Sequence, residues 1–122
     1  RGHTDSVTSL AVGPNEDELI SGSYDKTIRI WNLISGECTK ILKEHTSWIT
    51  ALLSHRNGNI MSASSDKNIK IWDRESGKCI KTLDGHTSFI SSLLLSNQDE
   101  ELISGDGNGE IRLWNLNNYE CK

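Results

Sequence analysis

Histidine, serine and aspartate, the three side chains of a nucleophilic hydrolase, recur together along this chain. In such enzymes an imidazole takes the proton of the serine hydroxyl while a carboxylate orients the imidazole. The first two sets are His3, Ser21 and Asp25, then His45, Ser62 and Asp66. Hydrolysis is nevertheless a poor interpretation. The set occurs twice, each serine lies inside a strand pattern instead of on an exposed turn, and nothing supplies an oxyanion hole.

A glycine-rich run, Gly105-Asp106-Gly107-Asn108-Gly109, has the composition of a phosphate-binding or calcium-binding loop. No helix or P-loop lysine follows it, and it lacks the spaced acidic ligands of a calcium loop. The run aligns with the segment Ser23 to Lys26, which is predicted to be a tight turn between strands. We therefore expect a hairpin turn here, with no metal and no cofactor.

The chain is built from an internal repeat. Trp31, Trp72 and Trp114 lie 41 and 42 residues apart. A fixed period of this length indicates a repeat architecture, with units at about 2–43, 44–84 and 85–122 of one domain, 1–122. Cysteines 38, 79 and 121 follow the same period. Equivalent positions diverge in space, so we expect thiols in a reducing compartment and not a metal site or a disulfide framework.

Each unit is predicted to hold four short strands separated by turn residues. The first strands are Val7–Val12, Ile49–Leu53 and Ile90–Leu95. The second strands are Glu18–Ser23, Asn59–Ser64 and Glu101–Gly105. The third strands are Thr27–Asn32, Asn68–Asp73 and Glu110–Asn115. The fourth strands are Cys38–Leu42, Cys79–Leu83 and a stub at Tyr119–Lys122. The first strands are apolar on both faces, which favours stacked four-stranded sheets in an all-β fold.

Charge and hydropathy exclude two broad classes of partner. The formal net charge is −4, from 13 basic and 17 acidic residues, which argues against a general nucleic-acid binder. No apolar run approaches the length needed to span a membrane. We therefore expect protein partners, with no nucleic acid and no membrane.

Three features repeated in register resemble the WD-repeat β-propeller family: a Gly-His pair, a Ser-Gly-Ser-x-Asp turn and an Ile-Arg-Ile-Trp-Asn ending. Trp72-Asp73 is the dipeptide that names the family. The resemblance implies that each unit is a four-stranded blade and that the chain forms part of a ring. Propellers close with four to eight blades. Three blades therefore predict either a homodimer that closes a six-bladed ring or covalent neighbours in a longer chain.

The same resemblance implies a buried structural tetrad in each unit. The predicted sets are His3, Ser21, Asp25 and Trp31; His45, Ser62, Asp66 and Trp72; and His86, Ser104, Asn108 and Trp114. Asp accepts from the imidazole, the other ring nitrogen meets the serine hydroxyl, and serine meets the indole N–H. Asn108 stands where the other units have Asp, so the third network is expected to be weaker.

Three aromatic residues are candidates for binding a partner. Trp48 and Phe89 each lie three residues after the loop histidine, and Tyr24 precedes the turn aspartate. The resemblance places these positions beside the central channel, where aromatic rings serve as anchors. Packing against the neighbouring blade is the alternative.

The resulting hypothesis is a WD-repeat scaffold for protein–protein interaction, without catalysis of its own. The alternative is a propeller segment of a larger enzyme, or of a ubiquitin-ligase substrate receptor, whose active part lies outside this chain. The thiols favour an intracellular, cytoplasmic location and leave the nucleus open.

Overall fold

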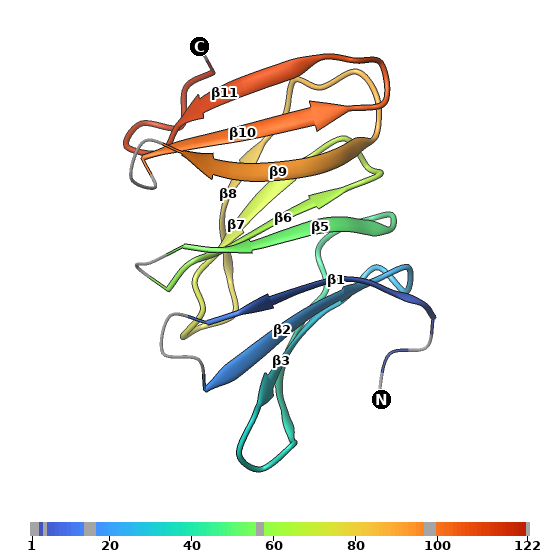
Figure 1. Ribbon diagram of the computed structural model, residues 1–122, viewed down its shortest axis with the longest axis vertical. Helices are drawn as coiled ribbons and strands as arrows, with labels where there is room; N and C mark the ends of the chain where they lie inside the picture. The colour runs from blue at the N-terminus through green and yellow to red at the C-terminus, as the bar shows by residue number, and fades with distance from the viewer. Residues whose placement is uncertain (1–2, 4, 14–16, 56–57, 97–99, 122) are drawn as a thin grey trace.

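Period-two alternation of apolar side chains determines the architecture seen in the computed structural model, which describes residues 3, 5–13, 17–55, 58–96 and 100–121. Within these residues every regular element is a strand. Three antiparallel sheets lie one above the next, and the chain passes through them in order (Figure 1). No described segment forms a helix long and apolar enough to cross a membrane.

Each sheet is a meander in which consecutive strands pair. Sheet 1 contains β1 (Val7–Val12), β2 (Glu18–Ser23), β3 (Ile28–Asn32) and β4 (Cys38–Leu42). Sheet 2 contains β5 (Ile49–Ser54), β6 (Ile60–Ser64), β7 (Ile69–Trp72) and β8 (Cys79–Leu83). Sheet 3 contains β9 (Ile90–Ser96), β10 (Glu101–Asp106) and β11 (Ile111–Asn115).

The fourth strand of the third unit differs from its prediction. Where a strand was expected at Tyr119–Lys122, the described residues form one isolated bridge between Cys121 and Trp114. Tyr119 has a left-handed backbone, with φ of 62°, which is incompatible with a regular strand. Lys122 lies outside the described residues.

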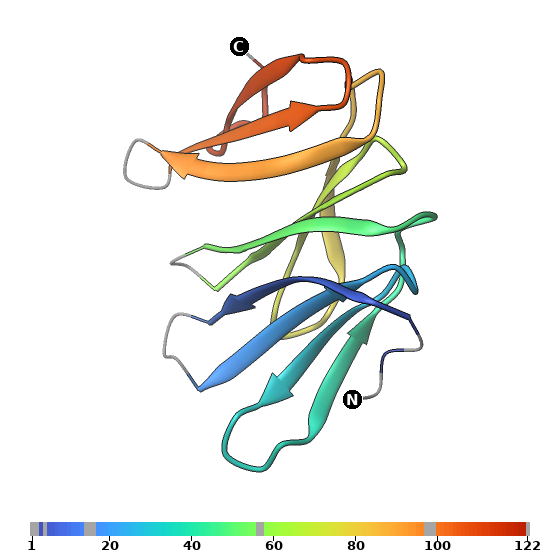
Figure 2. The same cartoon turned by 45° about the vertical axis from the view of Figure 1, so that its right-hand side comes forward.

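The sheets approach one another most closely along their first strands, so β1, β5 and β9 line one side of the stack (Figure 2). Two threonine hydroxyls tie these strands together. Thr8 Oγ1 donates to the carbonyl of Ile49 at 2.5 Å, and Thr50 Oγ1 donates to the carbonyl of Ile90 in the same way. The outer strands diverge, as in the blades of a propeller.

Two apolar clusters fill the spaces between the sheets. The cluster between sheets 1 and 2 is formed by Ile20, Ile28, Ile30, Leu42, Ile49, Leu52, Ile60 and Trp72. The cluster between sheets 2 and 3 is formed by Met61, Ala63, Ile69, Ile71, Leu83, Ile90, Leu102 and Trp114. Isoleucine is the commonest residue in both because β-branched side chains pack well on a pleated surface.

Candidate functional site

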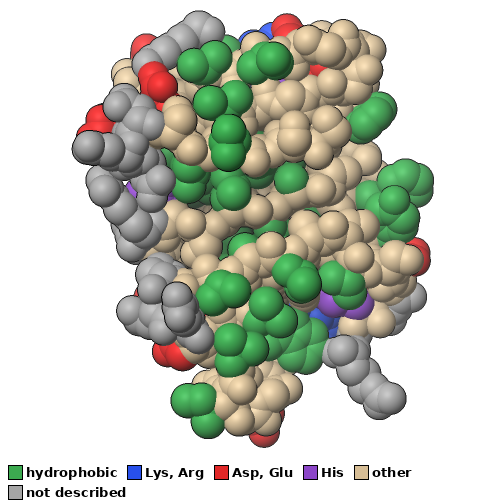
Figure 3. Space-filling view, viewed as in Figure 1, with side chains coloured by type: hydrophobic (Ala, Val, Ile, Leu, Met, Phe, Trp, Pro, Cys, Tyr) green, Lys and Arg blue, Asp and Glu red, His purple; other side chains and the backbone are tan. Residues whose placement is uncertain are grey.

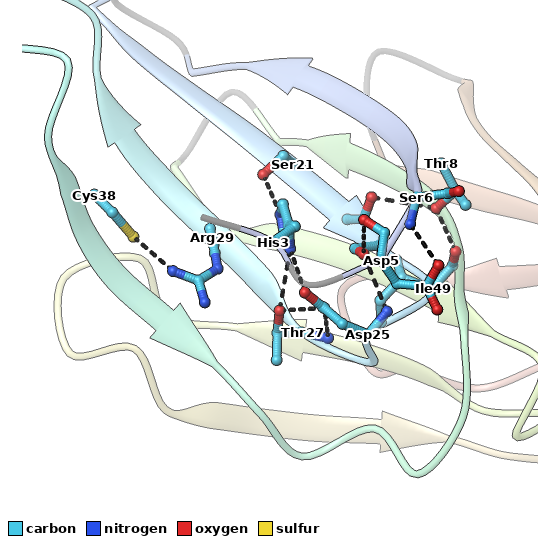
Figure 4. A network of polar contacts seen from close by, with 12 residues as sticks. His3, Asp5, Ser6, Thr8, Ser21, Asp25, Thr27, Arg29, Cys38 and Ile49 are labelled. Carbon is cyan, nitrogen blue, oxygen red and sulfur yellow. Dashed lines mark hydrogen bonds and ion pairs between the residues drawn. The ribbon is translucent and has the colours of Figure 1, made fainter. Parts of the chain in front are cut away.

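The predicted residues of the first unit meet in one polar network. His3 Nδ1 lies 2.8 Å from Asp25 Oδ2, and His3 Nε2 lies 2.7 Å from Ser21 Oγ. Trp31 Nε1 donates to the same Ser21 oxygen at 2.9 Å. Figure 4 shows the imidazole held between the strand serine and the turn aspartate, with Thr27 beside it. The loop that precedes β1 is thereby attached to the β2–β3 turn.

The second unit repeats this geometry. His45 Nδ1 lies 2.8 Å from Asp66 Oδ2, and His45 Nε2 lies 2.7 Å from Ser62 Oγ. Trp72 Nε1 donates to Ser62 Oγ at 2.8 Å. Asp66 also accepts from the backbone N–H groups of Thr46 and Asn68.

The third unit contains a complete network, but its carboxylate was assigned wrongly from the sequence. His86 Nδ1 lies 2.9 Å from Asp106 Oδ2, whereas Asn108 bonds through its amide to Thr87 at 3.3 Å. Asp106 is the last residue of β10 and shares a face with Ser104, two residues earlier, so its side chain can reach the imidazole. Ser104 completes the set by accepting from Trp114 Nε1 at 3.0 Å and lying 2.6 Å from His86 Nε2. The third network therefore carries a charge like the other two.

Burial and hydrogen bonding shift the pKa of two of these carboxylates in opposite directions. Burial alone would raise the pKa of Asp66, but the hydrogen bond and charge of His45 and two backbone N–H groups hold that pKa below its usual value. The pKa of Asp106 is likewise lowered, because His86 and the backbone N–H groups of Glu110 and Asn108 outweigh the effect of burial. Both groups are therefore stabilised as carboxylates.

The arrangement is unsuited to nucleophilic catalysis. Ser21, Ser62 and Ser104 are buried inside β-strands, and each hydroxyl oxygen is already bonded to an imidazole and an indole. A nucleophile needs its oxygen exposed to substrate. We therefore assign the histidine–serine–aspartate sets to the stability of the blades.

One acidic cluster has donor types that suit a metal ion. His86, Asp106 and Glu110 offer ligand atoms within 4.8 Å of one another. Most of their polar atoms are engaged in hydrogen bonds and ion pairs within the protein, whereas Glu110 Oε1 makes no hydrogen bond and lies 3.7 Å from His86 Nδ1. Asp106 Oδ1 accepts from the N–H groups of Asn108 and Glu110, and Glu110 Oε2 pairs with Arg112 at 3.1 Å. Hydrogen bonds and ion pairs within the protein therefore account for the positions of these three side chains.

The three candidate aromatic residues come together at the end of the sheets where the β2–β3 and β6–β7 turns lie. Tyr24 and Trp48 stack across sheets 1 and 2, with ring centroids 4.8 Å apart and 33° between the planes. Tyr24, Trp48 and Phe89 remain 40%, 49% and 48% exposed. Figure 3 shows hydrophobic side chains at the right-hand edge of the molecule, where these turns lie. Trp48 therefore packs against the neighbouring sheet and is also about half exposed.

These aromatic residues surround a pocket of about 670 Å³. It is lined by Tyr24, Trp48, Thr50, Ser65, Lys67, Thr87, Ser88, Phe89 and Asn108. Hydroxyl groups and one ammonium group accompany the rings. Phe89 lies against the backbone of Gly107, where a Cβ atom would come within 2.4 Å of the ring. An open pocket in which three aromatic rings lie among six polar residues is suited to binding.

Sequence reasoning missed two further groups that hold the site together, namely Asp106 and the pair Thr8 and Thr50. The threonines occupy equivalent positions 42 residues apart, so the repeat itself carried a signal for them. Asp106 carried a weaker signal, because it falls two positions before the turn residue used in the other units.

Comparison with known proteins agrees with this geometry. The family model "WD domain, G-beta repeat" matches residues 1–32, 36–73 and 77–115. Pre-mRNA-processing factor 19 from Bos taurus is 36% identical over 61 residues, which is 50% of this chain and 12% of that protein. F-box/WD repeat-containing protein 10 from Homo sapiens is 48% identical over 52 residues, or 43% of this chain and 5% of that protein.

A third relative, the ribosome biogenesis protein BOP1 homolog from Drosophila erecta, is 46% identical over 43 residues, or 35% of this chain and 6% of that protein. The chain thus covers no more than 12% of the length of each of these three relatives.

Proposed function

The chain belongs to the WD-repeat family, and on that premise we propose that it serves as a scaffold for protein–protein interaction, with no catalysis of its own. The observation that carries this proposal is the exposed aromatic group of Tyr24, Trp48 and Phe89 around one pocket. Large rigid rings contribute contact area at a low cost in conformational entropy, which makes them effective binding anchors.

The pocket also has a composition that suits a protein partner. Ser65, Thr87 and Ser88 place hydroxyl groups beside the rings, where they can bond to a partner's backbone. Lys67 supplies the single charged side chain of the lining. We expect a partner segment that inserts an apolar side chain between the aromatic residues.

The relatives support a shared scaffold role rather than one shared activity. Their names refer to pre-mRNA processing, to an F-box protein and to ribosome biogenesis. What this chain has in common with them is a stretch of repeats. Within a longer polypeptide the same surface would serve an enzyme or a ubiquitin-ligase substrate receptor whose active part lies elsewhere. For location, the unbridged thiols of Cys38 and Cys79 support the cytoplasm, with the nucleus left open.

The test is affinity capture with matched variants of one chain. Trp48→Ala and Phe89→Ala should abolish capture of the proteins retained by the parent, while circular dichroism shows the same strand content. Ile34→Ala is the control, since Ile34 is 89% exposed in the β3–β4 turn and lies outside the pocket. Retention of the same proteins by all three variants would contradict the proposal.

A further inference from the structure

The turns between second and third strands carry different side chains at one equivalent position. Tyr24 of the first unit is replaced by Ser65 in the second unit and by Gly107 in the third. The backbone N–H of each residue donates, at 2.9 Å in every case, to the carbonyl of the residue just before the first strand of its own sheet. The three positions therefore differ in their side chains and not in how the backbone places them.

At the first junction between sheets, the ring of Tyr24 occupies the space beside the next sheet. It packs on Trp48 of sheet 2, with ring centroids 4.8 Å apart. At the second junction the corresponding pair is Ser65 of sheet 2 and Phe89 of sheet 3, and serine has no ring to place there. Ser65, Trp48 and Phe89 all line the pocket of about 670 Å³. The pocket thus contains the space that a tyrosine ring takes at the first junction.

The walls of this pocket suit an aromatic side chain. Trp48 and Phe89 are each about half exposed, so both rings have surface available for a further contact. Phe89 lies against the backbone of Gly107, which supports its ring without covering it. Two aromatic rings in contact attract one another beyond the effect of the area that they bury. A third ring between Trp48 and Phe89 would gain from both neighbours.

The charge of the pocket indicates what should accompany that ring. Lys67 is exposed and is the one charged residue among the described residues of the lining. No carboxylate in the described part of the chain forms an ion pair with it. The hydroxyl groups of Ser65, Thr87 and Ser88 are further hydrogen-bond donors. An unpaired ammonium group among such donors attracts a carboxylate and repels a cationic segment.

We propose that this pocket binds a segment of a partner protein in which an aromatic residue lies next to an acidic residue. The aromatic ring takes, between Trp48 and Phe89, the place that Tyr24 takes at the first junction, and the carboxylate pairs with Lys67 Nζ. The inference rests on the proposed function, because it specifies the chemistry of the partner at the same pocket.

A peptide series tests this chemistry directly. The probe is acetyl-Gly-Glu-Tyr-Glu-Gly-amide, titrated into the 122-residue chain while the indole N–H resonance of Trp48 is followed by NMR. Alanine in place of the tyrosine should weaken binding about tenfold or more. Glutamine in place of both glutamates should weaken binding about threefold at low salt, and lysine should weaken it further. The difference between the glutamate and glutamine peptides should disappear at about 0.5 M salt.

Ser65→Tyr tests the pocket from within the chain. The new ring should fill the space beside Phe89 and weaken binding of the probe about tenfold or more, whereas Ser65→Ala should bind like the parent. Tyr24 already occupies the equivalent position, so we expect the variant to fold, and circular dichroism checks this. The peptide series on the parent chain decides independently if the variant does not fold.

Lys67→Gln tests the charge. It should make the chain bind the glutamate and glutamine peptides equally. Lys26→Gln is the matched control, because Lys26 has the same turn position and the same φ of 75° but lies outside the pocket lining. It should retain the preference for glutamate.

The outcomes separate this inference from the proposed function. Equal binding of the tyrosine and alanine peptides, or of the glutamate and glutamine peptides at low salt, overturns the inference. So does a parent chain that binds none of the peptides, or one that binds only when phosphoserine replaces glutamate. In affinity capture, loss of the retained proteins with Trp48→Ala but not with Ser65→Tyr leaves the scaffold proposal standing and overturns the insertion of an aromatic ring beside Phe89.

Discussion

Asp106 Oδ2 lies 2.9 Å from His86 Nδ1, although Asp106 stands two residues before the position that supplies the carboxylate in the other units. Asp25 and Asp66 reach His3 and His45 from the turn, at 2.8 Å in both cases. A strand residue and a turn residue thus bring a carboxylate to the same ring nitrogen. The network depends on the position of the oxygen atom and not on the position in the sequence.

Alanine substitutions should show whether Asp106 or Asn108 completes the network of the third unit. Asp66→Ala is expected to lower the free energy of unfolding by about 1–3 kcal/mol, because it leaves buried donors unpaired. Asp106→Ala should shift the urea midpoint by a comparable amount. Asn108→Ala should change the free energy of unfolding by less than about 0.5 kcal/mol, since its side chain makes one exposed hydrogen bond. If Asn108→Ala lowered the free energy of unfolding as much as Asp106→Ala, Asn108 would belong to the third network, as the sequence predicted.

Acid should destabilise the fold through Asp66 and Asp106. Their pKa values are lowered in the folded chain, so they bind protons less readily there than in the unfolded chain. The stability that they contribute is complete above the unfolded pKa of about 3.9 and is lost as the pH falls through the lower folded pKa. Urea midpoints measured from neutral pH to about pH 3 should show this fall. Asp66→Asn should reduce its steepness, and an unchanged slope would show that Asp66 is not linked to folding.

The two threonine contacts between first strands should act at different junctions, so single substitutions should affect different sheets. Thr8→Val removes the hydroxyl that donates to Ile49, and Thr50→Val removes the one that donates to Ile90. Each change should cost about 0.5–1.5 kcal/mol. Amide hydrogen exchange should become faster in β1 for the first variant and faster in β9 for the second. If both variants loosen all three sheets equally, the hydroxyls do not act at individual junctions.

Two glycines at equivalent positions should respond differently to a methyl group. A Cβ atom on Gly22 would lie 2.5 Å from Ile49 Cγ2 on sheet 2, whereas one on Gly105 would first meet Ser92 Oγ at 3.1 Å. Sheet 2 accommodates Ala63 at this position, so Gly22→Ala should cost only about 1 kcal/mol of unfolding free energy. Gly105→Ala should change that free energy by less, because Ser92 is exposed and its hydroxyl can move aside. Urea midpoints of the two variants measure the difference. A larger loss of unfolding free energy for Gly105→Ala than for Gly22→Ala would contradict the tight contact between Gly22 and Ile49.

The period and the alternation of apolar residues predicted the strands well. Eleven of the predicted β segments correspond to strands of the structure whose ends differ by one residue or none, because Ile28, Ile30 and their equivalents must all face a neighbouring sheet. Four of them, β1, β2, β4 and β8, match without change. The missing strand near Cys121 and the role of Asp106 could not be predicted in this way. Both depend on local backbone geometry, the left-handed turn at Tyr119 and the extra residue at the end of β10, which alignment by position cannot reveal.

Equivalent residues at every junction make the number of units adjustable. If residues 44–84 were removed, Ile20, Ile28 and Ile30 of sheet 1 would meet Leu102 and Trp114 of sheet 3, which are the types of residue that they meet now. The apolar residues of these faces do not specify a particular neighbour, although the ion pair between Arg74 Nε and Glu18 Oε1, at 2.5 Å, belongs to the first junction. Duplication or loss of one whole unit would therefore leave each remaining junction intact, and ring size would be set by the angle between sheets.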